Sequence, residues 1–200
     1  MAVIGELLFY SGRSPGLSDV LRHNLENEVP AKVDRISVSE FDRRTDEELT
    51  AMIVEQAKAE PLKLRLEEAD AEVTEKAVTA QDVFGGTANI PGLRVTKIVP
   101  FDGDADLFKM APNTFDLNPP RGEVWGHKLV VGMEIPESES ESELQYVEQT
   151  LTRVEEHIRR QQDQLDEHNS QLPGAALAAI QRRRASLGKA SDLAARLRGR

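Results

Sequence analysis

Cysteine is missing from this chain of 200 residues. Its absence excludes disulfide bonds, thiolate nucleophiles and zinc sites built on cysteine, and it fits the reducing environment of the cytoplasm. Aromatic residues are scarce as well, at 4% of the chain. Because so few rings would poorly fill the core of a β-sandwich, we expect a good part of the chain to be exposed helix.

Long apolar runs are also missing, since no stretch approaches the roughly 20 residues that cross a bilayer as a helix. Residues 1–13 contain neither a basic leader nor a small-residue cleavage site, so they do not resemble a signal peptide. We therefore expect a cytoplasmic protein without a membrane segment.

The sequence lacks the metal- and phosphate-binding motifs HExxH, GxGxxG and GxxxxGK[ST], and its single GxSxG match, at Gly12–Gly16, falls in a proline- and glycine-containing segment that is expected to break the chain. His157 and His168 stand eleven residues apart, which does not suit a shared metal ion. The segment Asp102–Asp106 begins no EF-hand loop, because glycine and glutamate are absent at the required places. We therefore assign no catalytic, cofactor-binding or metal-ligating residue and expect no cofactor. The single tryptophan, Trp125, is interpreted as a core anchor rather than a ligand-stacking residue.

The first two thirds of the chain show both helix and strand patterns. Thr45 and Glu48 form a capping box, which predicts a helix over about 46–59 that Pro61 ends. A helical pattern before it is expected to end at Pro30. Apolar and polar residues alternate in several segments, which predicts strands at 32–38, 62–66, 73–78, 93–99 and 123–135.

Short loops between successive strands favour antiparallel pairing, so the expected fold is α+β with a small, mostly antiparallel sheet and short helices. Gly126 or Gly132 is expected to form a turn or bulge within the last strand segment, and 85–92 to form a loop. The polar span 102–121 should be ordered, because it is anchored by Phe101, Leu107, Phe108, Phe115 and Leu117.

The final third changes character. Apolar residues step by three and four, which is typical of a heptad seam, at Leu144, Val147, Leu151, Val154, Ile158, Leu165 and Leu172. Pro173 and Gly174 should break this helix, and apolar residues then recur up to Leu197. We therefore predict an α+β domain at 1–136, followed at 137–200 by an antiparallel helical hairpin with helices over about 138–172 and 175–197.

Charge is distributed unevenly over the chain, whose formal net charge is −10. The last twenty residues nevertheless carry seven basic side chains and one acidic side chain. Two interpretations remain open: ion pairs with acidic residues of the facing helix, or binding of nucleic acid. The candidate nucleic-acid-binding residues are Arg182, Arg183, Arg184, Arg196 and Arg198.

The open end of the predicted hairpin would bring together four apolar residues, which are the candidate partner-binding residues Leu144, Tyr146, Leu193 and Leu197. Such a patch suits docking of a second subunit or of a separate protein, and packing on the chain's own α+β domain is an equal alternative. We expect at least a dimer.

Several segments, taken in order, resemble uncharacterised bacterial proteins in which a similar region precedes a nuclease-like or TIR-like effector domain. The resemblance is carried by 60–64, 100–104, 107–108, 110–113, 117–124 and 168–172. It implies an accessory or assembly module of a bacterial stress or antiphage-defence system, and it supplies no catalytic residue.

The sequence thus favours a non-enzymatic protein-interaction or assembly module over an enzyme. A nucleic-acid-binding accessory protein that uses the basic C-terminal helix is the alternative. A hydrolase whose carboxylates converge only in the fold is a more distant third possibility.

Overall fold

The computed structural model describes residues 2–12, 15–81, 86–113, 116, 118–137 and 141–199. The chain forms two compact units, each made of two separate stretches. Unit 1 contains Met1–Leu17 and Glu60–Gln162, and unit 2 contains Ser18–Ala59 and Asp163–Arg200. The expected boundary after residue 136 lies inside unit 1, whose second stretch continues to Gln162.

Unit 1 is built on a seven-stranded sheet whose described pairings are all antiparallel. The strands are β1 (Ala2–Val3), β2 (Glu6–Leu7), β3 (Lys63–Leu64), β4 (Asp70–Gln81), β5 (Thr87–Asp102), β6 (Arg121–Trp125) and β7 (Lys128–Pro136). Their order is β2-β6-β7-β5-β3, with β1 beside β7 and β4 beside β5. The predicted α+β class and the mostly antiparallel sheet are confirmed.

Several predicted details of this sheet hold. The segments 73–78 and 93–99 lie inside β4 and β5, and Gly126 makes the turn between β6 and β7 with a φ of +57°. Only glycine adopts such a conformation readily. The segment 62–66 contributes just the short β3, because the chain then turns into a 3₁₀ helix, η2 (Leu66–Glu68).

The two predicted loops differ in outcome. β5 begins at Thr87, so most of the expected loop 85–92 is strand. In the polar span, a 3₁₀ helix, η3 (Ala105–Lys109), buries Leu107 and Phe108 as expected. Phe115 and Leu117, two other expected anchors, lie outside the described residues.

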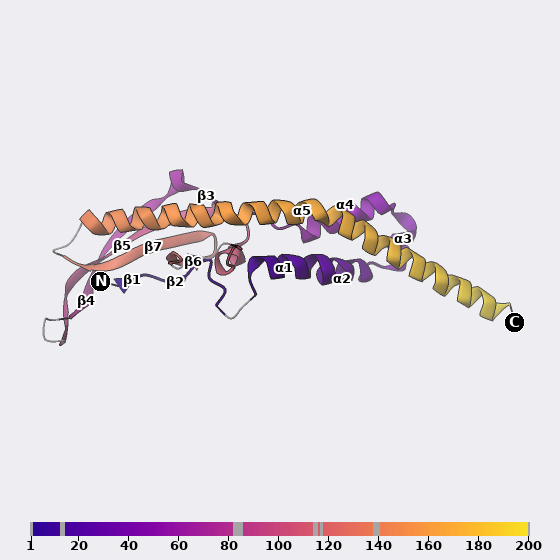
Figure 1. The fold of residues 1–200 in the computed structure, drawn as a ribbon, viewed down its shortest axis with the longest axis horizontal. Helices are drawn as coiled ribbons and strands as arrows, with labels where there is room; N and C mark the ends of the chain where they lie inside the picture. The colour runs from indigo at the N-terminus through magenta and orange to yellow at the C-terminus, as the bar shows by residue number, and fades with distance from the viewer. Residues whose placement is uncertain are drawn as a thin grey trace. The chain divides into compact units, whose positions relative to one another are not determined.

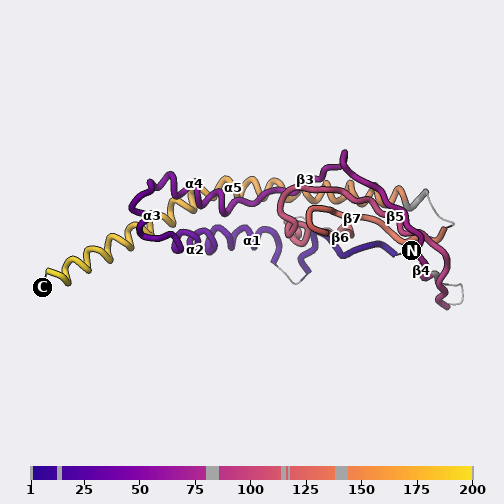
Figure 2. Tube along the Cα trace, turned by 180° about the vertical axis from the view of Figure 1, so that it is seen from behind, coloured from indigo at the N-terminus to yellow at the C-terminus, as the bar shows by residue number. Residues whose placement is uncertain are grey.

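The beginning of α5 (Glu141–Arg198) lies along the sheet of unit 1 (Figures 1 and 2). The seam residues Val147, Leu151 and Val154 are buried there. At the rim of this contact, Lys97 of β5 donates to Glu148 at 2.7 Å. The apolar spacing therefore identified the buried face of the helix, whose partner is the sheet rather than a second helix.

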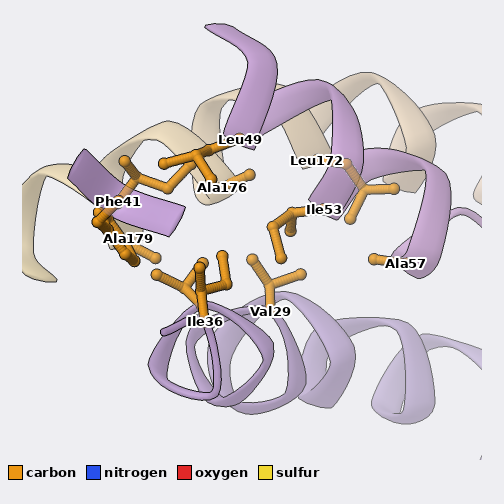
Figure 3. Packing of buried hydrophobic residues seen from close by; sticks show 11 residues of the cluster. Val29, Ile36, Phe41, Leu49, Ile53, Ala57, Leu172, Ala176 and Ala179 are labelled. Atoms are coloured by element: carbon orange, nitrogen blue, oxygen red, sulfur yellow. The ribbon is translucent and has the colours of Figure 1, made fainter. Parts of the chain in front are cut away.

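Unit 2 is helical. Its helices are α1 (Leu17–His23), the π turn η1 (Asn24–Glu28), α2 (Val29–Asp34), α3 (Val38–Arg43), α4 (Asp46–Ala57) and the part of α5 from residue 163. Figure 3 shows the core between α2, α3, α4 and α5, which contains Val29, Val33, Ile36, Phe41, Leu49, Ile53, Ala57, Leu172, Ala176, Ala179 and Ile180. The predicted capping box is confirmed: Glu48 donates its N–H to Thr45, and Glu48 accepts from the Thr45 N–H at 2.9 Å.

The strand predicted at 32–38 is wrong. Its first residues end α2, and Ser37 caps α3 by accepting from the Glu40 N–H at 3.3 Å. Val33 and Ile36 are three residues apart, which is helical spacing, and both are buried in the core. The expected stop at Pro30 is also wrong, because the π turn η1 runs directly into α2 and the backbone stays helical through Glu28 and Val29.

The predicted hairpin is wrong as well, since α5 is a single helix of 58 residues that contains Pro173. Core residues stand on one stripe on both sides of the proline, at Leu172 and Ala176. Because Pro173 has no N–H, the carbonyl four residues before it, that of Asn169, loses its helical hydrogen bond. Pro173 and Gly174 are exposed, so water can replace this hydrogen bond. One turn earlier, the Asn169 amide pairs with both backbone groups of Ala59 at 3.0 Å. Burial of the continuous stripe thus outweighs the cost of the proline.

Candidate functional site

The end of α5 is the least covered part of unit 2. Helices α2 to α4 bury α5 as far as Ile180, and Leu187 still packs against the core. In residues 188–198, here called the C-terminal segment, Leu193 and Leu197 are 59% and 77% exposed. These turns extend past α2–α4 in Figures 1 and 2. The segment therefore presents apolar side chains that the described residues of unit 2 leave largely exposed.

These apolar residues continue the buried stripe. Ala190, Ala194 and Leu197 follow Leu187 at steps of three, four and three, and Leu193 lies one turn before Leu197. Residues at this spacing share one helix face. The same face that is buried in the core of unit 2 is thus uncovered in the C-terminal segment.

The surroundings of this face are basic. Lys189, Arg196 and Arg198 are exposed, and Asp192 is the one acidic residue in the segment. Six residues before the segment, Arg182 is also exposed, and among the described residues its guanidinium donates to the Ala178 carbonyl alone, at 3.4 Å. The uncovered apolar face is therefore bordered by positive charge.

Arg183 and Arg184, two candidate nucleic-acid-binding residues, are engaged inside unit 2. Arg183 pairs with Asp34 at 3.5 Å. Arg184 pairs with Asp46, donates to the carbonyls of Phe41 and Arg44 at 2.8 Å each, and lies 5.3 Å from the centre of the Phe41 ring. The ion pairs left open by the sequence thus exist, but with α2 and α4 rather than with a facing helix of a hairpin.

The four candidate partner-binding residues do not form one group. Leu144 and Tyr146 stand in the first turns of α5 and belong to unit 1, whereas Leu193 and Leu197 stand in the last turns and belong to unit 2. Leu144 is exposed and Tyr146 is half-buried. The expected patch depended on the hairpin and is abandoned with it.

Tyr146 instead lines an open pocket of about 540 Å³ in unit 1. The polar lining comes from Tyr10, Asp116, Asn118, Arg121, Tyr146 and Arg153, and the apolar lining from Val3, Leu7 and Pro119. Most small-molecule sites are of this size and mix apolar walls with a few polar groups.

Asp116, which is part of the pocket lining, is held in place by a buried histidine. His157 Nε2 lies 2.9 Å from an Asp116 oxygen, Arg160 lies 4.0 Å from the same oxygen, and the Asn118 N–H donates to the other at 2.8 Å. The Asn118 N–H, with His157 and Arg160, holds the pKa of Asp116 below its usual value although burial opposes them. The carboxylate is therefore ionised at neutral pH.

Burial lowers the pKa of His157, and the Asp116 carboxylate only partly opposes this effect. The neutral ring must carry its proton on Nε2 to donate to Asp116, which leaves Nδ1 as a bare acceptor. Within the described residues, Nδ1 is buried without a hydrogen-bond partner. Since no substrate can reach it, we assign this pair to positioning Asp116 rather than to proton transfer.

Phe9 stacks on the His157 ring with a centroid distance of 4.9 Å and an interplanar angle of 6°. Its φ of 54° lies in the left-handed region, which costs a residue with a side chain on the order of 1 kcal/mol or more. The chain therefore keeps a strained residue directly before Tyr10, at the wall of the pocket. The sequence carried no signal for this strain.

Two polar residues, Gln161 and His168, are buried on the same face of α5 as the seam residues. Gln161 donates to the carbonyls of Leu107 and Met110 at 3.0 and 2.6 Å, and it thereby fixes η3 to α5. His168 is buried in unit 2, and burial lowers its pKa. Neither residue is on the surface.

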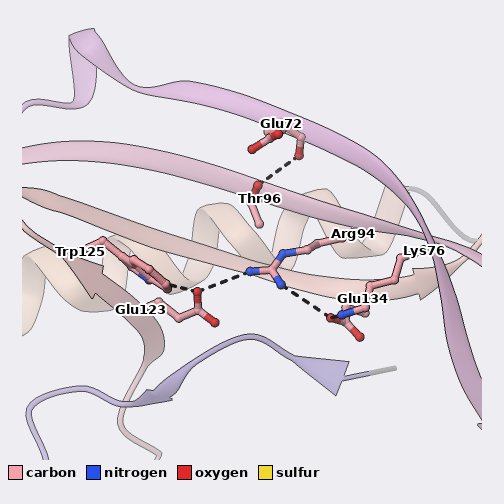
Figure 4. A network of polar contacts seen from close by, with 7 residues as sticks. All are labelled: Glu72, Lys76, Arg94, Thr96, Glu123, Trp125 and Glu134. Carbon is pink, nitrogen blue, oxygen red and sulfur yellow. Dashed lines mark hydrogen bonds and ion pairs between the residues drawn. The ribbon is translucent and has the colours of Figure 1, made fainter.

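Trp125 is 68% exposed, so its interpretation as a core anchor is wrong. Figure 4 shows it beside a chain of charges in which Arg94 bridges Glu123 at 3.4 Å and Glu134 at 3.9 Å. Lys76 also pairs with Glu134, and the Trp125 indole donates to Glu123 at 3.3 Å. These residues compensate one another, so they leave little net charge for a ligand.

Among the residues that the structure describes, no group of three or more histidine and carboxylate side chains could hold a metal ion. The helices of that part of the chain also include none that is long and apolar enough to cross a membrane. Comparisons of the chain with protein-family models, with curated proteins and with solved structures found no match.

Proposed function

We propose that this chain is a non-enzymatic interaction module whose C-terminal segment of α5 docks an amphipathic helix with acidic flanks from a partner protein. The observation that supports the proposal is the exposure of Leu193 and Leu197 on a stripe that is buried earlier in the same helix. Fully burying a leucine side chain contributes about 1.5 to 3 kcal/mol. Two leucines and the alanines beside them can therefore anchor a helix.

The charge around the stripe supports an acidic partner. Lys189, Arg196 and Arg198 border the leucines, against Asp192 alone. The same segment of a second copy would bring like charges together, which disfavours self-association through it. Glutamates at the flanking positions of a partner helix would instead face these cations, as in heterodimeric coiled coils.

The low helical stability expected of the C-terminal segment alone also supports binding of a partner helix. Its eleven residues include Gly188, which costs a helix about 1 kcal/mol relative to alanine. Helices of this length are marginal in water without tertiary contacts. A partner helix would supply the missing contacts, and the amide protons of the segment should then exchange more slowly.

A four-heptad peptide with leucine at a and d and glutamate at e and g is a suitable probe. By isothermal titration calorimetry, it should bind the full chain with a dissociation constant in the micromolar range. The double variant Leu193→Asp/Leu197→Asp should abolish binding, because it places charges in the contact. Leu144→Asp is the matched control, since Leu144 is an exposed leucine of α5 in unit 1, and it should leave binding unchanged.

Arg196→Gln/Arg198→Gln should weaken binding of this peptide severalfold and reduce its dependence on salt. Equal affinity for a lysine-flanked peptide, or no binding at 1 mM peptide, would refute the proposal. Binding of duplex DNA that needs Arg196 and Arg198 but not Leu193 and Leu197 would refute it in favour of a nucleic-acid-binding accessory. A place in a bacterial stress or antiphage-defence system is supported by the sequence resemblance alone.

A further inference from the structure

We infer that the pocket of unit 1 binds a small molecule that combines a planar ring with one anionic group, either a phosphate or a carboxylate. This site is independent of the C-terminal segment, so it is a second binding function. Its lining provides three kinds of contact, which come from cationic, aromatic and hydrogen-bonding side chains.

Arg121 and Arg153 provide the anion contact. Within the described residues neither of them forms an ion pair, although unit 1 contains more acidic than basic residues. Arg121 donates to the Gly5 carbonyl at 3.3 Å, and Arg153 donates to the Gln149 carbonyl at 3.5 Å. A guanidinium has five N–H donors in a planar fork, so both retain donors for a phosphate or carboxylate.

Tyr10 and Tyr146 provide the ring contact, with Val3 and Leu7 as apolar neighbours in the same lining. Aromatic side chains stack on planar ligands and tolerate different rings. Their hydroxyl groups can also donate to the anionic group. A ligand with a ring and an anionic group would contact the aromatic part of the lining as well as the arginines, whereas inorganic phosphate would leave the aromatic part empty.

Asp116 sets a further requirement on the ligand. Its carboxylate would repel an anion, but the Arg160 guanidinium, 4.0 Å away, partly compensates its charge, and the neutral His157 donates a hydrogen bond to it. Because an ionised carboxylate only accepts hydrogen bonds, a hydroxyl or amino group on the ring would be favoured beside it. Nucleoside monophosphates and hydroxylated aromatic acids both fit this description.

The pocket is largely formed without a ligand. Tyr146, Arg153 and Arg160 are seven residues apart along α5, so they lie on one stripe of a rigid helix. His157 fixes Asp116 from the same helix, and the left-handed backbone of Phe9 precedes Tyr10. Such pre-organisation reduces the entropic cost of binding.

Calorimetric titration of the full chain with four probes tests the inference: AMP, 4-hydroxybenzoate, adenosine and inorganic phosphate. At least one of the first two should bind below 1 mM, and both adenosine and phosphate should bind at least tenfold more weakly than it. Comparison of AMP with 4-hydroxybenzoate then distinguishes a phosphate from a carboxylate ligand.

Arg153→Gln and Arg121→Gln should each weaken the tighter probe by about tenfold or more, since a lost hydrogen bond to a charged group has that effect. Arg159→Gln is the matched control, because Arg159 is an exposed arginine of α5 outside the pocket lining, and it should change nothing. Failure of both ring-bearing anions to bind at 1 mM, or equal binding of phosphate alone, would overturn the inference. Equal loss in the Arg159 variant would overturn it too.

Discussion

Arg184→Met tests whether Arg184, a candidate nucleic-acid-binding residue, instead stabilises the fold of unit 2. In the folded chain the Arg184 guanidinium satisfies the carbonyls of Phe41 and Arg44 and pairs with Asp46. Methionine keeps the apolar length of the side chain but removes every donor. The two carbonyls at the end of α3 and the carboxylate at the start of α4 then lose their protein partner together.

The size of the effect follows from these contacts. Each hydrogen bond to a charged group contributes about 1.5 to 3 kcal/mol when buried. The Arg184 side chain is 36% exposed, so water replaces part of what is lost. We therefore expect Arg184→Met to lower the free energy of unfolding by about 2 to 3 kcal/mol, and Arg184→Lys by about half as much, because an ammonium group cannot reach all three acceptors.

Urea unfolding followed by far-UV circular dichroism measures this loss, since unit 2 is helical. Fluorescence does not report on it, because the single tryptophan, Trp125, belongs to unit 1. Arg182→Met is the matched control: Arg182 is exposed and, within the part of the chain that the structure describes, donates only to the Ala178 carbonyl, so its loss should stay within about 0.5 kcal/mol. Equal, small effects of Arg184→Met and Arg182→Met would refute the structural assignment of Arg184.

Burial lowers the pKa of both His157 and His168 below the ordinary 6.5, so the unfolded chain binds more protons than the folded chain just below that pH. The contribution of these two histidines to the free energy of unfolding should therefore be constant above about pH 7 and fall as the pH drops below about 6.5, and His168→Gln should flatten this slope. Trp125 should show the red-shifted emission and ready acrylamide quenching of an exposed indole, and a blue-shifted, protected spectrum would contradict its placement. Leu151→Ala should lower the free energy of unfolding by about 2 to 4 kcal/mol by leaving a cavity under α5, as urea titration would measure; a loss below 1 kcal/mol would contradict its burial against the sheet.

Local and near-neighbour patterns were enough to predict much of the fold. The helix after Thr45 is specified by a capping box that closes within four residues, and the turn at Gly126 requires a conformation that glycine alone adopts readily. The three-and-four spacing in α5 likewise reflects which face of the helix is buried. These features are determined by the sequence because each depends on contacts over a few residues.

The candidate functional sites depended on contacts that no local pattern contains. Asp116 and His157 stand 41 residues apart, and Arg184 meets Asp46 across 138 residues. The exposure of Leu193 and Leu197 could not be read from spacing either, because the same stripe is covered at Leu172. Which turns of a helix are covered by other elements depends on the tertiary structure of the whole unit.

The sequence by itself determined the α+β class, the antiparallel pairing of the strands and the buried face of α5. Only the tertiary structure decided that the helix continues through Pro173, that 32–38 is helical and that Trp125 is exposed. The physical reason is the same for the two helical segments. Propensities of single residues are worth about 1 to 3 kcal/mol, and burial of several apolar side chains in a shared core outweighs them.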